Sequence, residues 1–251
     1  MIEGAIPAAT LVIMRPGVDG VDELLLVKRS ATMAFAAGAV VFPGGRIDPD
    51  DFAVAALHGA GPDDVGAAAQ VAAIRETLEE TGLPVGWSAL ARDDVAEVRR
   101  ALLAEQPLSA MLTAAGQRLD LDALTPFARW CPNFKESRTF DTWFFVAAAP
   151  PAETALSVSM AEHSDIFWAS AAATLAAADR GDLAIIFPTR RNLERIDAHG
   201  DYPRFAAHAR ATPVRRITPW VEEREGATHL CIPADLGYPI TSEPFSLVRR
   251  G

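Results

Sequence analysis

The sequence predicts an α/β (α+β) fold in which a mixed β-sheet lies between helices, within a single domain of residues 1–251. Helical segments mix with short strands that do not alternate strictly with them. No internal repeat or low-complexity linker divides the chain. Hydrophobic residues make up 50% of the chain and charged residues 22%, a composition typical of a globular protein with a sizeable core.

The N-terminal region is predicted to contain three short strands, at residues 8–14, 23–28 and 39–42. The first strand ends at the turn Arg15-Pro16-Gly17, and we expect it to pair with the second. The third strand stops at Pro43-Gly44-Gly45. Residues 48–66 are polar and rich in Gly and Asp, so we interpret them as an inserted excursion with one helical turn near residues 52–57.

A helix is predicted over residues 64–81. An Asp within Pro62-Asp63-Asp64 is expected to cap its start, and Gly82 followed by Pro84 ends it. On a wheel of ~100° per residue, one apolar stripe and one acidic cluster lie on opposite faces. The stripe consists of Ala67, Val71, Ile74 and Leu78, and the cluster of Glu76, Glu79 and Glu80.

The rest of the chain is predicted to alternate between helices and strands. A helical insert, residues 86–127, contains helices at 93–105 and 108–115. The strands that follow are expected at 127–130, 139–148 and 166–169, and the helices at 170–179, 189–199 and 203–211. We treat residues 185–251 as a C-terminal extension whose tail, from Pro213, is rich in turns and β-prone residues.

Charge and cysteine content exclude several classes of protein. The net charge is −10 and the pI about 5.0, which argues against a general nucleic-acid binder. No apolar run reaches the ~18 residues of a membrane span, and the N-terminus lacks a basic region of a secretory signal. Two cysteines do not form a disulfide framework. We therefore expect a cytoplasmic protein without membrane or nucleic-acid partners; a homodimer is left open.

The acidic cluster of the 64–81 helix points to a metal site. Its three carboxylates lie at i, i+3 and i+4 spacing, where like charges repel one another. A multivalent cation would convert this repulsion into binding, and Mg²⁺ and Mn²⁺ prefer hard oxygen ligands. A solvated acidic surface is the alternative interpretation, and the motif around the helix favours the metal.

That motif resembles the Nudix box, G-x5-E-x7-R-E-U-x-E-E-x-G-U with U apolar. The second half matches at Arg75, Glu76, Glu79, Glu80, Gly82 and Leu83, while Thr77 replaces an aliphatic residue. Counting from Gly45, the first acid falls on Asp51, and 23 residues (52–74) then precede Arg75 where the pattern has seven. We interpret the difference of sixteen as an insertion inside the box. Asp51 or Asp64 could supply the acid, or it is absent.

The resemblance implies a Nudix α/β/α sandwich and a metal-dependent hydrolase of phosphorus-containing acid anhydrides. Mg²⁺ or Mn²⁺ ions would bind Glu76, Glu79 and Glu80 and activate water against a diphosphate. By analogy, the carbonyl of Gly44 is a further ligand, and Arg75 orients Glu79. Glu162, which precedes the strand at residues 166–169, is a candidate for an additional acid from elsewhere in the chain.

A second motif suggests the substrate. Residues 25–45 resemble the coenzyme A signature of some Nudix enzymes, L-L-T-x-R-[SA]-x3-R-x3-G-x3-F-P-G-G. They match it at Arg29, Ser30, Gly38 and Phe42-Pro43-Gly44-Gly45. They depart from it at Val27, where the signature has Thr, and at Ala34, where it has a second Arg. Residues 138–145, Trp168 and 188–193 resemble the peroxisomal acyl-CoA diphosphatase branch. Candidate substrate-binding residues are Arg29, Met33, Phe42, Gly45 and Arg138.

Three functions follow from these motifs. The first is a CoA or acyl-CoA diphosphatase that releases adenosine 3′,5′-bisphosphate and a 4′-phosphopantetheine product. The second acts on another nucleotide compound, such as a dinucleotide, NADH, ADP-ribose or a nucleotide sugar, which the loss of an Arg at Ala34 favours. The third is a nucleotide-sensing module without catalysis, which the complete acidic cluster disfavours.

Overall fold

The computed structural model describes residues 4–18, 20–30, 36–87, 90–91, 94–132, 139–150, 163–224 and 226–248. Among them, eight strands form one mixed sheet of order β3-β2-β1-β6-β5-β8, with β4 paired to β1 and β7 to β2. The sheet is mixed because β1–β6 and β5–β8 are parallel and the other pairs antiparallel. The strands are β1 (Ile6–Arg15), β2 (Glu23–Arg29), β3 (Val40–Val41), β4 (Gly44–Arg46), β5 (Thr125–Trp130), β6 (Phe140–Ala148), β7 (His163–Ser170) and β8 (Arg216–Ile217).

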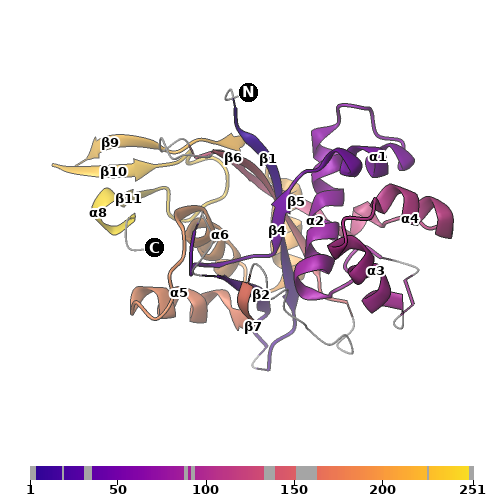
Figure 1. Cartoon of the computed structure of the whole chain (residues 1–251). Coiled ribbons are helices and arrows are strands. Elements are labelled where there is room, and N and C mark those ends of the chain that lie inside the picture. Colours follow the sequence, from indigo (N-terminus) through magenta and orange to yellow (C-terminus); the bar gives the residue numbers. More distant parts are fainter. Residues whose placement is uncertain are drawn as a thin grey trace.

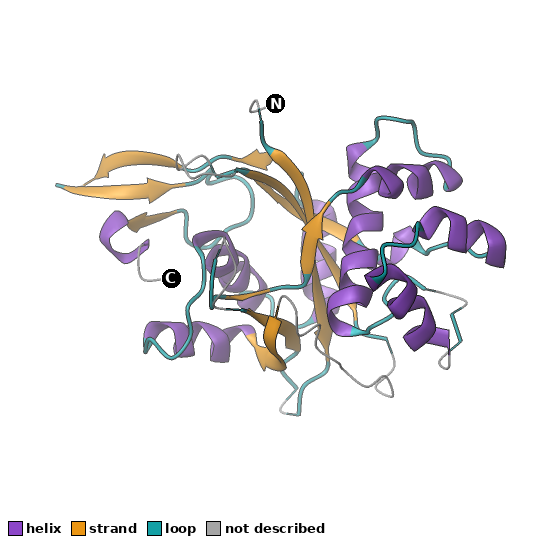
Figure 2. Ribbon diagram, in the orientation of Figure 1, coloured by secondary structure: helices purple, strands orange, loops and turns teal. Residues whose placement is uncertain are grey.

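Helices cover both faces of this sheet, as Figures 1 and 2 show. One layer consists of α1 (Pro49–Leu57), α2 (Val65–Thr81), α3 (Val95–Leu103) and α4 (Leu108–Ala115), followed by the 3₁₀ turn η2 (Leu121–Ala123). The other consists of α5 (Ala171–Asp179), α6 (Phe187–Asp197) and α7 (Tyr202–Ala211). The expected mixed sheet between helices is thereby confirmed.

Strand β1 shows why the chain forms two cores. Val12 and Met14 pack into the core beneath α5–α7, and Leu11 and Ile13 pack into the core beneath α2. Successive side chains of a strand point to opposite faces, so a strand covered on both sides must be apolar throughout. The unbroken apolar run of this segment follows from that position.

The C-terminal region adds a smaller sheet, β11-β10-β9, and a short terminal helix. The elements are β9 (Trp220–Arg224), β10 (Ala227–Cys231), β11 (Ser242–Pro244) and α8 (Phe245–Val248). Figure 1 shows the β9–β10 hairpin reaching away from the main sheet. Leu230 of β10 is nonetheless buried in the core beneath α5–α7, so the base of this sheet belongs to the same packed body.

Two local predictions were wrong in detail. The strand at residues 39–42 does stop at Pro43, but Gly44 starts a new strand, β4, that pairs with Ala8, Ala9 and Thr10 of β1. The excursion at 48–66 contains a full helix, α1, with Pro49 at its first position. Both elements are stabilised by packing on β1 and α2, which the local sequence does not reveal. No helix among the described residues has the length and apolarity to cross a membrane.

Candidate active site

The site is built on α2, whose ends are fixed by local sequence. Asp64 precedes the helix and its Oδ1 accepts a hydrogen bond from the backbone N–H of Ala67 at 3.0 Å. Gly82 ends the helix with φ 77°, and its N–H binds the carbonyl of Leu78. An Asp cap and a left-handed Gly are common helix boundaries, and the predicted helix is confirmed at both ends.

The acidic residues of α2 are covered rather than solvated. Val71, Ile74 and Leu78 are fully buried against the sheet, as the wheel predicts. Glu80 is only 4% exposed, and the side chains of Glu76 and Glu79 are 15% and 19% exposed. The alternative of an open acidic surface is therefore wrong, because β4 and the neighbouring helices lie over this face. Carboxylates in such a place need partners of opposite charge or hydrogen-bond donors.

The two glycines of β4 allow this strand to lie close to both β1 and α2. The N–H of Gly44 donates to Glu80 Oε2 at 3.0 Å. A Cβ on Gly45 would overlap the carboxylate of Glu76, and a Cβ on Gly44 would overlap the backbone of Ala9 and Thr10 in β1. Gly44 thus lets β4 lie close to β1, and Gly45 leaves the space that the carboxylate of Glu76 occupies.

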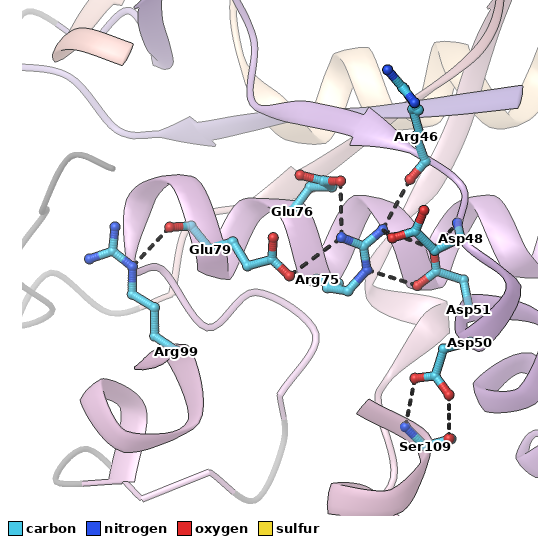
Figure 3. A network of polar contacts seen from close by, with 9 residues as sticks. All are labelled: Arg46, Asp48, Asp50, Asp51, Arg75, Glu76, Glu79, Arg99 and Ser109. Atoms are coloured by element: carbon cyan, nitrogen blue, oxygen red, sulfur yellow. Dashed lines mark hydrogen bonds and ion pairs between the residues drawn. The ribbon is translucent and has the colours of Figure 1, made fainter. Parts of the chain in front are cut away.

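Arg75 is the centre of the polar network in Figure 3. Its Nε donates to Asp51 Oδ1 at 3.0 Å and its Nη2 to Asp51 Oδ2 at 2.9 Å, so the ion pair is bidentate. Asp51 is 1% exposed and also accepts from the backbone N–H of Asp48 at 2.8 Å, within the capping box of α1. The pair therefore ties the first turn of α1 to the middle of α2.

The remaining donors of Arg75 face the acidic cluster. Nη1 donates to Glu76 Oε1 at 2.9 Å and lies 3.4 Å from Glu79 Oε1. Nη2 also donates to the backbone carbonyl of Arg46 in β4 at 3.0 Å. One guanidinium thus links α1, α2 and β4, and it holds two of the three glutamates.

These contacts distinguish the positions considered for the first acid of the motif. Asp51 reaches Arg75 although residues 52–74 separate them in the chain. Asp64 is occupied as the cap of α2, and Ala67 lies one turn into that helix with its side chain in apolar packing. Among these three, Asp51 is the acid that the fold brings to the second half of the motif.

Burial raises the pKa of Glu76 to about 7, against the opposing charge of Arg75. It likewise raises the pKa of Glu79, again opposed by Arg75. Although burial works to lower the pKa of Arg75, the hydrogen bonds that it donates to Asp51 and the charges of the surrounding carboxylates raise it, so the guanidinium stays charged. The carboxylates around Arg75 therefore carry more negative charge than this guanidinium alone can balance.

The residues present fit a divalent cation. Asp48, Asp51, Glu76 and Glu79 all lie within 4 Å of one guanidinium, so four carboxylates meet one positive charge. Oxygen ligands of this kind suit Mg²⁺ or Mn²⁺. Within the described residues, no three acidic, His or Cys side chains already converge on one point. Because Arg75 contacts Oε1 of Glu76 and Oε1 of Glu79, each carboxylate would turn its other oxygen, Oε2, toward a cation.

The other residues that the sequence singles out have different locations. Arg29 lies at the end of β2, and its backbone N–H donates to the backbone carbonyl of Ala39 at 2.9 Å. Arg29 therefore lies beside the segment that leads through β3 to Gly44. Phe42 is 2% exposed and packs into the core beneath α5–α7, so its position serves packing. Met33, Arg138 and Glu162 lie outside the described residues.

Two contacts of the site were not anticipated from the sequence. Arg99 of α3 donates from Nε to the carbonyl of Glu79 at 2.9 Å and from Nη2 to the carbonyl of Glu80 at 3.3 Å. Asp50 of α1 accepts from the N–H of Ser109 in α4 at 3.0 Å and from its hydroxyl. For the Arg99 contact, the sequence offered one local indication: α2 has no basic residue in its last turn, so the carbonyls there need a donor from another segment.

Comparisons with known proteins agree with this geometry. Residues 5–98 match the family model of the NUDIX domain. A NUDIX hydrolase from Alicyclobacillus acidocaldarius is 31% identical with a TM-score of 0.70, and the match covers 82% of this chain and 97% of that one. No curated protein sequence matched.

Other solved structures are more distant. The NUDIX domain of Shewanella oneidensis NrtR, solved with ADP ribose, is 14% identical with a TM-score of 0.44 and coverages of 77% and 86%. An Ap4A hydrolase of C. elegans is 17% identical with a TM-score of 0.43 and coverages of 77% and 96%. The near full-length match at 31% identity, together with the motif on α2, decides the assignment. The chain belongs to the Nudix hydrolase family, and it is a diphosphatase.

Proposed function

We propose that this diphosphatase depends on Mg²⁺ or Mn²⁺ and that Glu76, Glu79 and Glu80 hold the ions, with the carbonyl of Gly44 as a further ligand. The observation that carries the proposal is the excess of buried and partly buried carboxylates around Arg75, beside a strand whose Gly45 makes room for Glu76. When bound, such ions neutralise charge developing on phosphorus and help ionise the attacking water.

The protein's own residues would prepare that site. Arg75 orients Glu76 and Glu79 through one Nη1 group, and Asp51 fixes the orientation of Arg75 with a bidentate pair. Gly45 leaves the space that the Glu76 carboxylate occupies. We propose that Asp51 serves as the first acid of a Nudix box that an insertion of sixteen residues has split, with residues 52–57 of α1 in the lengthened segment.

For the substrate, we propose CoA or an acyl-CoA. The resemblance of residues 25–45 to the coenzyme A signature supports this choice. The paired strands β2 and β3 place Arg29 one strand away from the segment that leads to Gly44. A cation on the strand next to β3 would suit a second phosphate of the same substrate. Arg138 and Met33 are proposed as further contacts from the sequence motif alone.

A second candidate is another nucleoside diphosphate compound, such as a dinucleotide, NADH, ADP-ribose or a nucleotide sugar. Ala34 occupies the position at which the coenzyme A signature has a second arginine, so one phosphate-binding cation of that signature is missing. This substitution favours a ligand with fewer phosphates than CoA, which carries a 3′-phosphate in addition to its diphosphate.

Product analysis by chromatography tests both candidates. The purified protein is incubated with Mg²⁺ or Mn²⁺ and a panel of CoA, acyl-CoAs, NADH, ADP-ribose, nucleotide sugars and dinucleoside polyphosphates. Fastest release of adenosine 3′,5′-bisphosphate from the CoA compounds is the expected result. Faster cleavage of another compound would refute the CoA assignment but leave the chemistry intact. Glu79→Gln should abolish turnover, whereas Glu97→Gln, an exposed acid on α3, should leave it unchanged.

A further inference from the structure

The C-terminal turn of α2 has an electrostatic problem that the helix does not solve itself. Glu79 and Glu80 lie in its last turn, at the negative end of the helix dipole, and this turn contains no basic residue. Acids at that end destabilise a helix, because their negative charge is repelled by the partial negative charge of the unpaired carbonyls. The turn that bears two of the proposed metal ligands is therefore expected to fray unless another segment holds it.

The carbonyls of this turn show the same need. The carbonyl of Leu78 accepts from the N–H of Gly82 at 3.0 Å, and that of Thr77 accepts from the hydroxyl of Thr81 at 2.6 Å. The carbonyls of Glu79 and Glu80 receive their donors from α3, through Arg99. Burial lowers the pKa of Arg99, but a guanidinium stays charged at neutral pH.

We propose that Arg99 is a positioning residue of the active site: its guanidinium binds the carbonyls of Glu79 and Glu80 and so fixes the backbone from which both carboxylates project. Its positive charge also offsets part of the repulsion at this end of α2. Helix α3 would then act on catalysis through the site's backbone. This inference rests on the proposed metal-binding role of the two glutamates.

The contacts of α3 separate this role from ordinary packing. Apolar packing of α3 involves Leu102, which is 4% exposed, and the partly buried Val95 and Val98. Arg99 instead donates from two nitrogens, Nε and Nη2, to two backbone carbonyls of α2. The single ammonium group of a lysine cannot reproduce this planar geometry. Arg100, the next residue, is exposed and provides a control of equal charge on the same helix.

The experiment compares the wild type with Arg99→Gln, Arg99→Lys and Arg100→Gln. Binding of Mn²⁺ alone is measured by electron paramagnetic resonance without substrate, and hydrogen exchange of the amides of residues 79–83 is measured without metal. Outer partners of metal ligands typically contribute 10–100-fold to affinity or activity. Arg99→Gln should weaken Mn²⁺ binding ~10-fold and speed exchange by a similar factor, with kcat falling more than KM rises.

The controls make each outcome decisive. The Mn²⁺ affinity and the exchange rates of Arg99→Lys should lie between those of the wild type and those of Arg99→Gln. If Arg99→Gln does not fold, Arg99→Lys takes its place in the comparison. Arg100→Gln should match the wild type. If Arg99→Gln lowers the melting temperature but leaves Mn²⁺ binding and the hydrogen exchange of residues 79–83 unchanged, the proposal is wrong. Arg99 would then contribute only to packing. Failure of the wild type to bind Mn²⁺ would instead overturn the proposed metal site, and the role of Arg99 with it.

Discussion

Replacement of Asp51 by Asn is the most direct test of how the site is held together. Asp51 is 1% exposed and binds Arg75 through both oxygens, while Arg75 is itself 8% exposed. The variant removes the charge but keeps the size, so Arg75 loses its best partner in a buried place. Removing one member of a buried ion pair typically costs ~3–5 kcal/mol. Because Glu76 and Glu79 still face the guanidinium, we expect about 3 kcal/mol, the lower limit.

Urea unfolding at pH 7 measures this loss, provided the slope of the transition is unchanged. The matched control is Asp64→Ala, which removes an exposed helix cap and should cost ~1 kcal/mol. For a chain of this length, ~3 kcal/mol corresponds to a decrease of about 6–12 °C in melting temperature. A loss for Asp51→Asn no larger than that of Asp64→Ala would refute the conclusion that the Asp51–Arg75 pair anchors α1 to α2.

Three further predictions concern space, pH and metal. Gly45→Ala should lower kcat at least ~10-fold, because the added Cβ would displace the carboxylate of Glu76. Gly61→Ala adds its Cβ in open space and should leave kcat unchanged. Equal kcat values for the two variants would contradict the close approach of β4 to α2. Burial and the nearby charge of Arg195 lower the pKa of His208 to about 4, below its unfolded value, so the folded protein binds fewer protons and loses stability as the pH falls from about 6.5 to 4. Allowing for the partial exposure of His208, the free energy of unfolding in urea should fall by ~1–2 kcal/mol less over this pH range for His208→Gln than for the wild type. Equal pH profiles for the two proteins would exclude His208 as the cause. Chelation with EDTA should abolish diphosphatase activity and addition of Mg²⁺ or Mn²⁺ restore it; activity that persists in EDTA would contradict the proposed metal dependence.

Helix α2 illustrates what local sequence can predict. Its start at Asp64 and its end at Gly82 depend on side-chain and backbone properties of those residues, and both agree with the structure. The stripe of Val71, Ile74 and Leu78 follows from helical periodicity alone. Elements with such local signals are therefore predictable without knowledge of the rest of the fold.

The partners of the site residues depend on contacts between distant segments. Whether Asp51 or Asp64 meets Arg75 is decided by the position of α1 against α2, and spacing alone left both open. The contact of Arg99 with the end of α2 depends in the same way on the packing of α3. Phe42, a motif position proposed for substrate binding, lies in the core beneath α5–α7, and the motif alone does not reveal that burial.

The Asp51–Arg75 pair also explains how a Nudix box could tolerate an insertion. Closing a flexible loop costs about (3/2)RT ln n, so lengthening the separation from seven to 23 residues adds only ~1 kcal/mol. Loss of the buried pair would cost ~3 kcal/mol or more, which exceeds that entropic penalty. Residues 52–57 of the connection also belong to helix α1, whose first turn is capped by Asp48 and Asp51, so fewer residues between Asp51 and Arg75 remain flexible. An insertion at this point should therefore lengthen the connection without separating the acid from its arginine.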